Sequence, residues 1–121
     1  MPALNFLKVN VPKIESGEKP HTIRRLGKRQ FKVGDRLYLY WGQRTKSCQK
    51  IGETNCIKVD SIRIYGDTKE IILNGKLLEP EQIAKLAIRD GFQDTMDFFE
   101  FFSRYSDFDG QVIWWNPKEI R

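Results

Sequence analysis

Hydrophobic and polar residues alternate along much of the chain, which is the pattern of β-strands with one buried face. Residues 36–41 show it most clearly, with Leu37, Leu39 and Trp41 on one face and two tyrosines on the other. Alternation and β-branched composition predict further strands at residues 4–9, 21–25, 44–51, 55–65, 69–73 and 111–115.

The strands at residues 44–51 and 55–65 are expected to form an antiparallel hairpin that turns around Gly52. Within the second strand, the apolar positions change face near Asp60 and Ser61. This change predicts a β-bulge or a bend of the kind that barrels use at their corners.

Two segments near the C-terminus place apolar residues at helical spacing instead. Pro80 is expected to open the first helix, and Gly91 is placed to cap its end. The second is expected to begin at Asp94, a residue type that caps helices well, and to end near Tyr105. Its phenylalanines, Phe99 among them, are interpreted as buried core, because aromatic residues at this spacing are far more often core than a ligand cage.

A length of 121 residues with 40% hydrophobic and 31% charged residues fits one globular domain spanning residues 1–121. The mixture of strands and helices predicts the α+β class. No apolar run approaches the roughly 18–20 residues that cross a bilayer, and the first residues lack the features of a signal peptide. We therefore expect a monomeric cytoplasmic protein with no membrane partner.

Cys48 and Cys56 are the only cysteines, and His21 is the only histidine. A zinc site needs about four ligands at short paired spacing, so the sequence predicts no metal site and no other cofactor. In a reducing cytoplasm, the two thiols are expected to be free packing residues rather than a disulfide.

Polar chemistry is concentrated around the strand at residues 21–25. A turn leads into this strand, and alternation then places Thr22 and Arg24 on one face and His21 on the other. Lys19 lies in the turn, from where its ammonium can reach the face that carries Thr22 and Arg24. A hydroxyl, a guanidinium and an amine at one strand entry form a candidate site, whereas His21 is interpreted as an ordinary strand residue.

Four motifs stand out along the chain. They are Gly17-x-Lys19-x-x-Thr22-Ile23-Arg24, then Phe31-x-x-Gly34-Asp35, then Ala-Ile-Arg-Asp-Gly-Phe at residues 87–92, and Val-Ile-Trp at residues 112–114. Together they resemble the signature of ASCH domains, small relatives of the RNA-binding PUA domains, over nearly the whole chain. The resemblance implies a PUA-like mixed β pseudobarrel of five to seven strands with two or three helices. It also implies a cleft for RNA or a modified nucleoside.

Some small bacterial ASCH domains are amidohydrolases that cleave acetylated cytidine with a threonine, a lysine and an acidic residue. The resemblance carries these roles to Thr22, Lys19 and Asp90, which is one methylene shorter than the family's glutamate. An ordinary lysine has a pKa of about 10.4. Lys19 can therefore accept the Thr22 proton only if burial or the neighbouring Arg24 lowers that pKa.

The plainer alternative is that Thr22 is a β-branched strand residue, that Lys19 and Arg24 bind phosphates, and that Asp90 is a paired carboxylate before a capping glycine. The residue pattern by itself favours this alternative over a catalytic site. The resemblance to amidohydrolases makes the support for the two interpretations more nearly equal.

The net charge of +5 hides an uneven distribution. Residues 1–63 hold fourteen Lys or Arg against five Asp or Glu, a balance of +9, whereas residues 64–121 hold seven against eleven, a balance of −4. Such a basic half attracts phosphates and nucleic acid, although charged runs are usually only a solvated surface. The predicted binding residues are Arg24, Arg25, Lys28, Arg29, Lys32 and Arg44.

We therefore expect recognition of RNA or a modified nucleoside in a basic cleft around the candidate site. Metal-independent hydrolysis of an acylated pyrimidine nucleoside such as acetylcytidine is the main alternative. A protein–protein adaptor is a third, which exposure of Phe98 or Phe101 would favour. Adjacent strand residues point to opposite sides, so one of Trp114 and Trp115 is expected to be exposed or to line the cleft.

Overall fold

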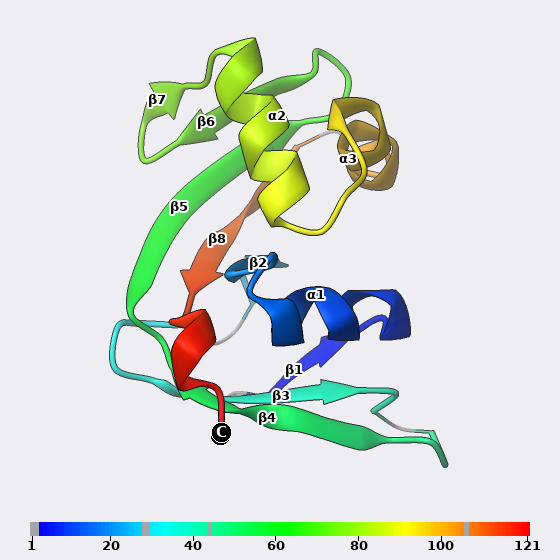
Figure 1. The fold of residues 1–121 in the computed structure, drawn as a ribbon. Helices are drawn as coiled ribbons and strands as arrows, with labels where there is room; N and C mark the ends of the chain where they lie inside the picture. Colours follow the sequence, from blue (N-terminus) through cyan, green and yellow to red (C-terminus); the bar gives the residue numbers. More distant parts are fainter. Residues whose placement is uncertain (1–2, 28–29, 44, 106) are drawn as a thin grey trace.

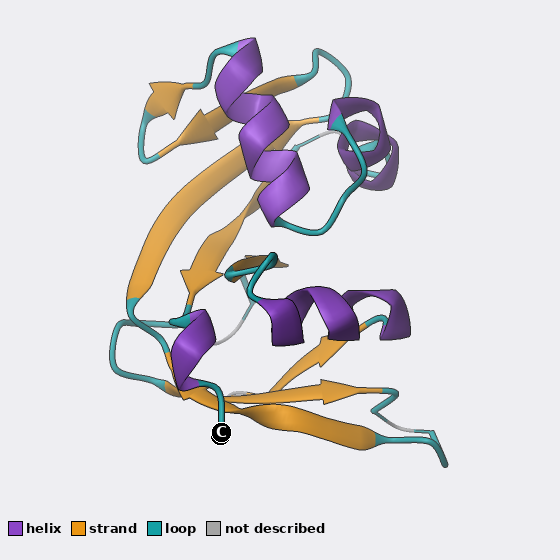
Figure 2. Cartoon of the chain, in the orientation of Figure 1, coloured by secondary structure: helices purple, strands orange, loops and turns teal. Residues whose placement is uncertain are grey.

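The structure is a computed structural model that describes residues 3–27, 30–43, 45–105 and 107–121. Within these residues the chain forms eight strands, three α-helices and two short 3₁₀ helices (Figure 1 and Figure 2). The strands are β1 (Ala3–Phe6), β2 (His21–Arg25), β3 (Arg36–Trp41), β4 (Gln49–Asn55), β5 (Lys58–Tyr65), β6 (Glu70–Leu73), β7 (Lys76–Leu77) and β8 (Phe108–Trp114). The helices are α1 (Val11–Ser16), α2 (Pro80–Arg89) and α3 (Thr95–Phe102), and the 3₁₀ helices are η1 (Lys8–Asn10) and η2 (Pro117–Glu119).

The strands of the described residues form two sheets, one of three strands and one of five. In the smaller sheet, β1 pairs parallel with β3, and β3 pairs antiparallel with β4. The larger sheet has the order β2-β8-β5-β6-β7 and is antiparallel throughout. The α+β class is therefore confirmed. Over the residues that the structure describes, the sheets do not close into a barrel and the strands number eight, so the expected pseudobarrel of five to seven strands is not confirmed.

Two hydrophobic cores lie on opposite faces of the larger sheet. One lies between this sheet and helices α2 and α3, which stand together at one end of the molecule in Figure 1. The other joins the larger sheet to the smaller sheet and α1. Val112 and Ile113, neighbours on β8, belong to different cores. Successive strand residues point to opposite faces, so a strand between two cores is apolar at consecutive positions.

Of the bulge or bend predicted near Asp60, the bulge is wrong. Strand β5 pairs with β8 in continuous register from Lys58 to Ile64, although β5 curves along its length in Figure 1. The register shift lies between β3 and β4 instead, where Ile51 of β4 is the extra residue. The apolar positions of β5 change face because Val59 packs against one core and Ile62 against the other. A strand covered on both faces therefore gives the same sequence pattern as a bulge.

The hairpin predicted around Gly52 is also wrong, because β4 pairs with β3 and belongs to a different sheet from β5. Gly52 lies inside β4, where an added Cβ would come 2.5 Å from the Ile120 side chain. Arg121 and Glu53 exchange two backbone hydrogen bonds there, each of 2.8 Å. The last residues thus extend the edge of the smaller sheet, and glycine permits their close approach.

The two predicted helices, α2 and α3, begin where they were expected, and no helix in the described residues is long and apolar enough to cross a membrane. Asp94 caps α3, and its side chain accepts a hydrogen bond from the backbone N–H of Asp97. Helix α3 ends at Phe102, before the predicted end near Tyr105. Phe98, Phe99 and Phe102 are buried, which confirms the core prediction for these three, whereas the prediction is wrong for Phe101, which is 40% exposed.

Truncation of the aromatic face of α3 gives a direct test of this packing. Phe98 is fully buried, whereas Phe101 on the same helix is 40% exposed. Phe98→Ala should lower the free energy of unfolding by about 3–5 kcal/mol, because it leaves a large cavity in the core. Phe101→Ala, the matched control, should lower it by about 1 kcal/mol or less. Denaturant unfolding measures both, and equal losses for the two variants would contradict the described packing.

Candidate functional site

A cavity of about 640 Å³ opens between β1, β2 and the turn that joins α2 to α3. Its volume lies within the roughly 300–1,000 Å³ that is typical of small-molecule sites. Lys19, Thr22, Arg24 and Asp90 all line it. The structure therefore brings together Lys19 from the turn before β2, two residues of β2 and the residue that caps the end of α2.

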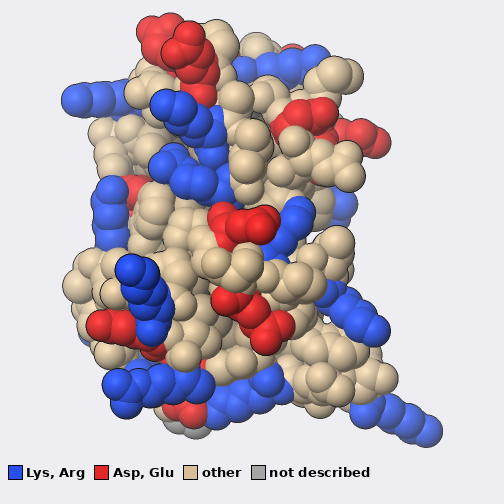
Figure 3. Space-filling view, in the orientation of Figure 1, with Lys and Arg blue, Asp and Glu red and all other residues tan. Residues whose placement is uncertain are grey.

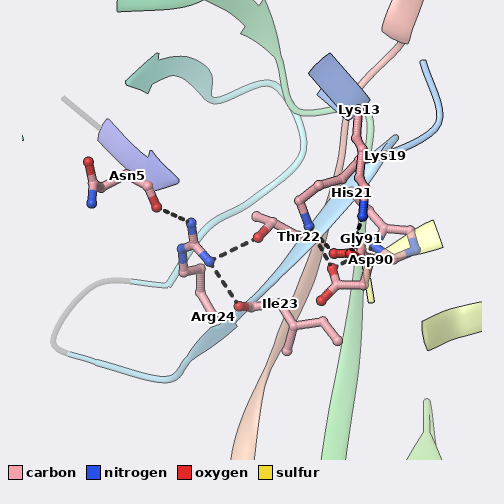
Figure 4. A network of polar contacts seen from close by, with 9 residues as sticks. All are labelled: Asn5, Lys13, Lys19, His21, Thr22, Ile23, Arg24, Asp90 and Gly91. Carbon is pink, nitrogen blue, oxygen red and sulfur yellow. Dashed lines mark hydrogen bonds and ion pairs between the residues drawn. The ribbon is translucent and has the colours of Figure 1, made fainter. Parts of the chain in front are cut away.

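The centre of the site is a buried contact between Lys19 and Asp90, drawn in Figure 4. The Lys19 Nζ donates a hydrogen bond to the backbone oxygen of Asp90 at 2.5 Å, and it lies 3.1 Å from the carboxylate Oδ1. The two residues are only 2% and 7% exposed. A charged amine and a carboxylate can be buried away from water only when they are paired and hydrogen-bonded in this way.

Two tight turns present these side chains to each other. Gly17 ends α1 with a φ of +88° and leads the chain to Lys19. Asp90 is the C-cap of α2, and Gly91 follows it with a φ of +98°. The left-handed backbone at Gly91 favours glycine, and an added Cβ would also lie 2.7 Å from the Asn10 Oδ1, so that the Asn10 side chain would have to shift.

His21 also reaches Asp90, which sequence reasoning missed. Its Nδ1 lies 3.2 Å from the same Oδ1 that Lys19 contacts, and the ring is fully buried. Its other nitrogen, Nε2, is buried and has no hydrogen-bond partner among the residues that the structure describes. The interpretation as an ordinary strand residue failed because strand alternation places His21 relative to Thr22 but says nothing of where α2 ends.

Burial sets the protonation of both bases. It lowers the pKa of Lys19, and the attraction and hydrogen bond of Asp90 oppose this effect without cancelling it. Arg24 and Lys13, both cations, lower the pKa of Lys19 further. Burial likewise lowers the pKa of His21, so the imidazole is neutral at pH 7. Lowered pKa values in a cavity are typical of functional sites.

Thr22 is held by Arg24 rather than by Lys19. The Arg24 Nη1 donates to Thr22 Oγ1 at 2.9 Å and to the backbone oxygen of Ile23 at 3.2 Å. Its Nη2 donates to the backbone oxygen of Asn5 at 2.8 Å. Since the Thr22 oxygen accepts from Arg24, its own proton remains available to a base or a ligand.

The outer walls of the cavity are aromatic and acidic. Phe92 and Phe101 contact each other there, with ring centroids 5.6 Å apart. Asp97 and Glu100 of α3 also line the wall, together with Arg104. The cavity therefore combines buried polar groups with aromatic ring surface and with more exposed charges of both signs.

Of the other predicted binding residues, Arg25 and Lys32 do not line the cavity. Arg25 is exposed, with its guanidinium 5.1 Å from the centroid of the Tyr105 ring, and Lys32 is exposed in the loop before β3. Lys28, Arg29 and Arg44 lie outside the described residues. Basic and acidic side chains are interspersed on the face shown in Figure 3, so this face is not a uniform basic surface.

The tryptophans and cysteines do not take part in the cavity lining. Trp115 is buried, whereas Trp114 is partly exposed and packs edge-on against His21 at a centroid distance of 4.4 Å. Cys48 is exposed and Cys56 is buried, and both are free. Among the described residues, no three His, Cys, Asp or Glu side chains gather in a way that would hold a metal ion.

Comparison of the chain with protein-family models, with curated proteins and with solved structures finds no match. The resemblance to ASCH domains therefore stays a prediction, and the functional conclusions depend on the geometry of the site itself.

The lowered pKa of His21 predicts a pH dependence of stability. An unfolded histidine has a pKa of about 6.5. Just below that pH, His21 binds a proton in the unfolded chain but not in the folded chain, where its pKa is lower. The free energy of unfolding should therefore decrease as the pH falls from about 6.5 towards the lower folded pKa. His21→Asn, which keeps an amide donor but cannot titrate, should lack this part of the decrease. Urea unfolding of both proteins from pH 5 to 8 measures it, and parallel curves would contradict the neutral buried imidazole.

Proposed function

We propose that this chain is an ASCH-like domain that binds a modified nucleoside in the cavity around Lys19 and Asp90. The observation that carries the proposal is the buried Lys19–Asp90 pair, with Thr22 and Arg24 beside it, at the base of a cavity of about 640 Å³. A buried ion pair contributes little net stability, so its position in a cavity favours a role in ligand recognition.

The cavity offers complementary groups for a nucleobase. Lys19, Thr22 and Arg24 supply donors and a hydroxyl for the polar edge of a base. Phe92 and Phe101 supply ring surface on which a base can stack. Such a combination of apolar walls with a few polar groups is typical of small-molecule sites.

The charge of the walls favours a nucleoside over a strand of RNA. Asp97 and Glu100, both more exposed than the buried ion pair, line the cavity, where they outnumber the exposed cation Arg104. Like charges at short range oppose the binding of RNA phosphates. Arg25 and Lys32, which are exposed, are the described predicted residues that remain available to phosphates.

A second function, hydrolysis of an acyl amide on that nucleoside, is favoured by the lowered pKa of Lys19. Neutral Lys19 removes the proton of Thr22, whose oxygen attacks the acyl carbonyl carbon, while Arg24 stabilises the oxyanion. The C–N bond breaks, and the leaving amine takes the proton back from Lys19. Water then hydrolyses the acyl–threonine ester, which releases the acid and restores Thr22. The first step requires Lys19 to exchange its contact with Asp90 for one with Thr22 when the substrate enters.

The adaptor function has less support. Phe98 is buried, and Phe101, although 40% exposed, packs against Phe92 and Phe102.

Binding is tested with cytidine and acetylcytidine by calorimetry. Arg24→Gln should weaken the affinity about 10- to 100-fold, because hydrogen bonds to charged groups contribute about 1.5–3 kcal/mol. Arg25→Gln, one residue further on the same strand and exposed, is the matched control and should leave the affinity unchanged. The affinity should vary little between about 50 and 200 mM salt, whereas a strand held by several phosphates would lose orders of magnitude. Binding of RNA but not of nucleosides would overturn the proposal.

Hydrolysis is tested by acetate release from acetylcytidine. Thr22→Val, nearly identical in shape, should abolish it, and Thr22→Ser should retain part of it because a hydroxyl remains. Lys19→Arg should also be inactive, since a guanidinium with a pKa above about 12 cannot accept the proton. If the unsubstituted protein and Thr22→Val release acetate at the same background rate while binding persists, the site binds but does not hydrolyse.

A further inference from the structure

We infer that His21 is a positioning residue, which holds the Asp90 carboxylate in place when Lys19 gives up its proton. As a role in catalysis this inference rests on the proposed function. The arrangement of hydrogen bonds on which it depends does not.

One carboxylate oxygen is shared by two donors. The Asp90 Oδ1 lies 3.1 Å from the Lys19 Nζ and 3.2 Å from the His21 Nδ1. Lys19 and His21 approach it from the same stretch of chain, one before β2 and one at its first residue. In the described part of the chain, these two side chains are the hydrogen-bond partners of this carboxylate.

The contact determines which imidazole nitrogen carries the hydrogen. An ionised carboxylate only accepts hydrogen bonds, so the His21 Nδ1 must donate. In a neutral ring the Nε2 then holds the lone pair, and it is buried with no partner among the described residues. A second proton on Nε2 would be a buried donor with nothing to bond, which is costly. It would also add positive charge beside Lys19 and Arg89, the two cations that act on this ring.

A neutral group that donates a hydrogen bond to the Asp90 carboxylate affects the protonation of Lys19. When Lys19 is charged, the carboxylate has the ammonium as its partner. When Lys19 loses its proton, a buried carboxylate without a strong partner would be very unfavourable. The His21 N–H remains and stabilises that charge, so the state with neutral Lys19 becomes accessible. Asp90, Arg24 and Lys13 are the other charged groups that act on Lys19, and none of them is a neutral donor.

This role differs from that of a packing residue, for which any side chain of similar size would serve. It requires a hydrogen-bond donor at the position of the Nδ1 atom. His21→Asn supplies one from its side-chain amide, whereas His21→Leu fills much of the space without one. Ile23→Val, two residues along the same strand and buried, removes packing without touching Asp90.

The first experiment uses the unsubstituted chain. Because His21 is the only histidine, long-range ¹H–¹⁵N NMR correlations of the labelled protein report on one ring without ambiguity. The expected result at pH 7 is a neutral imidazole with its hydrogen on Nδ1. A ring with its hydrogen on Nε2, or one protonated on both nitrogens, would overturn the inference.

The second experiment follows the titration of the Lys19 amine by NMR in protein labelled at lysine. His21→Leu should raise the pKa of Lys19 by about one to two units, the equivalent of losing a hydrogen bond to a charged group. His21→Asn should restore most of the difference, and Ile23→Val should leave it unchanged. A His21→Leu variant with the Lys19 titration of the unsubstituted protein would overturn the inference, as would equal shifts in all three variants.

If His21→Leu fails to fold, His21→Asn and the ring measurement on the unsubstituted chain still decide the matter. An Asn variant whose Lys19 titrates at the ordinary value for lysine would contradict the role of the donor. The proposed function fails separately, through absence of nucleoside binding and turnover by the unsubstituted protein.

Discussion

The buried contact between the Lys19 ammonium and Asp90 is the constraint on which the site depends. It joins residues that are 71 positions apart, and both are almost inaccessible to solvent. Removing two charges from water is so unfavourable that their mutual attraction rarely adds much net stability. The fold must therefore hold them together by other means, and most of the features around the cavity serve that purpose.

Several contacts fix the two ends of this pair. The Lys13 Nζ donates to the backbone oxygen of Gly91 at 2.7 Å, which ties α1 to the end of α2. The backbone N–H of Trp115 donates to the oxygen of Pro20 at 3.1 Å. This bond ties the turn before β2 to the end of β8, which is the neighbour of β2 in the larger sheet. Because β8 lies between two cores, the base of the cavity is anchored to a largely buried strand. The geometry at Asp90 thus depends on packing far from it.

Local patterns in the sequence predicted local structure well. The strand at residues 21–25, the strand at 36–41 and the starts of α2 and α3 depend on nearby residues alone. Errors arose where the outcome depends on which distant segments meet. Gly52 was interpreted as a turn, but the glycine is required by the returning C-terminus.

The residues of the candidate site likewise fall into those that local sequence patterns predicted and those that depend on distant segments. Alternation in β2 placed Thr22 and Arg24 together, and the hydrogen bond between them agrees with it. The inclusion of Asp90 came from the resemblance to ASCH domains, since no spacing in the sequence relates it to Lys19. The contact of His21 with Asp90 had no sequence signal beyond a single histidine on an apolar strand face. Similarly, Asp60 could not be recognised as buried without its partners Trp114 and Asn74.

The open cavity has a consequence for the chemistry of Lys19. Burial is the largest cause of its lowered pKa, and Asp90 is the main opposing influence. A flat ring seated against Phe92 and Phe101 would exclude more water, which penalises the charged amine further. The same exclusion strengthens the attraction of Asp90 for the ammonium. The two effects act on the pKa of Lys19 in opposite directions, and the net change depends on how strongly other groups already stabilise the Asp90 carboxylate. The hydrogen bond from His21 stabilises that carboxylate, so ligand entry can shift Lys19 towards its neutral form.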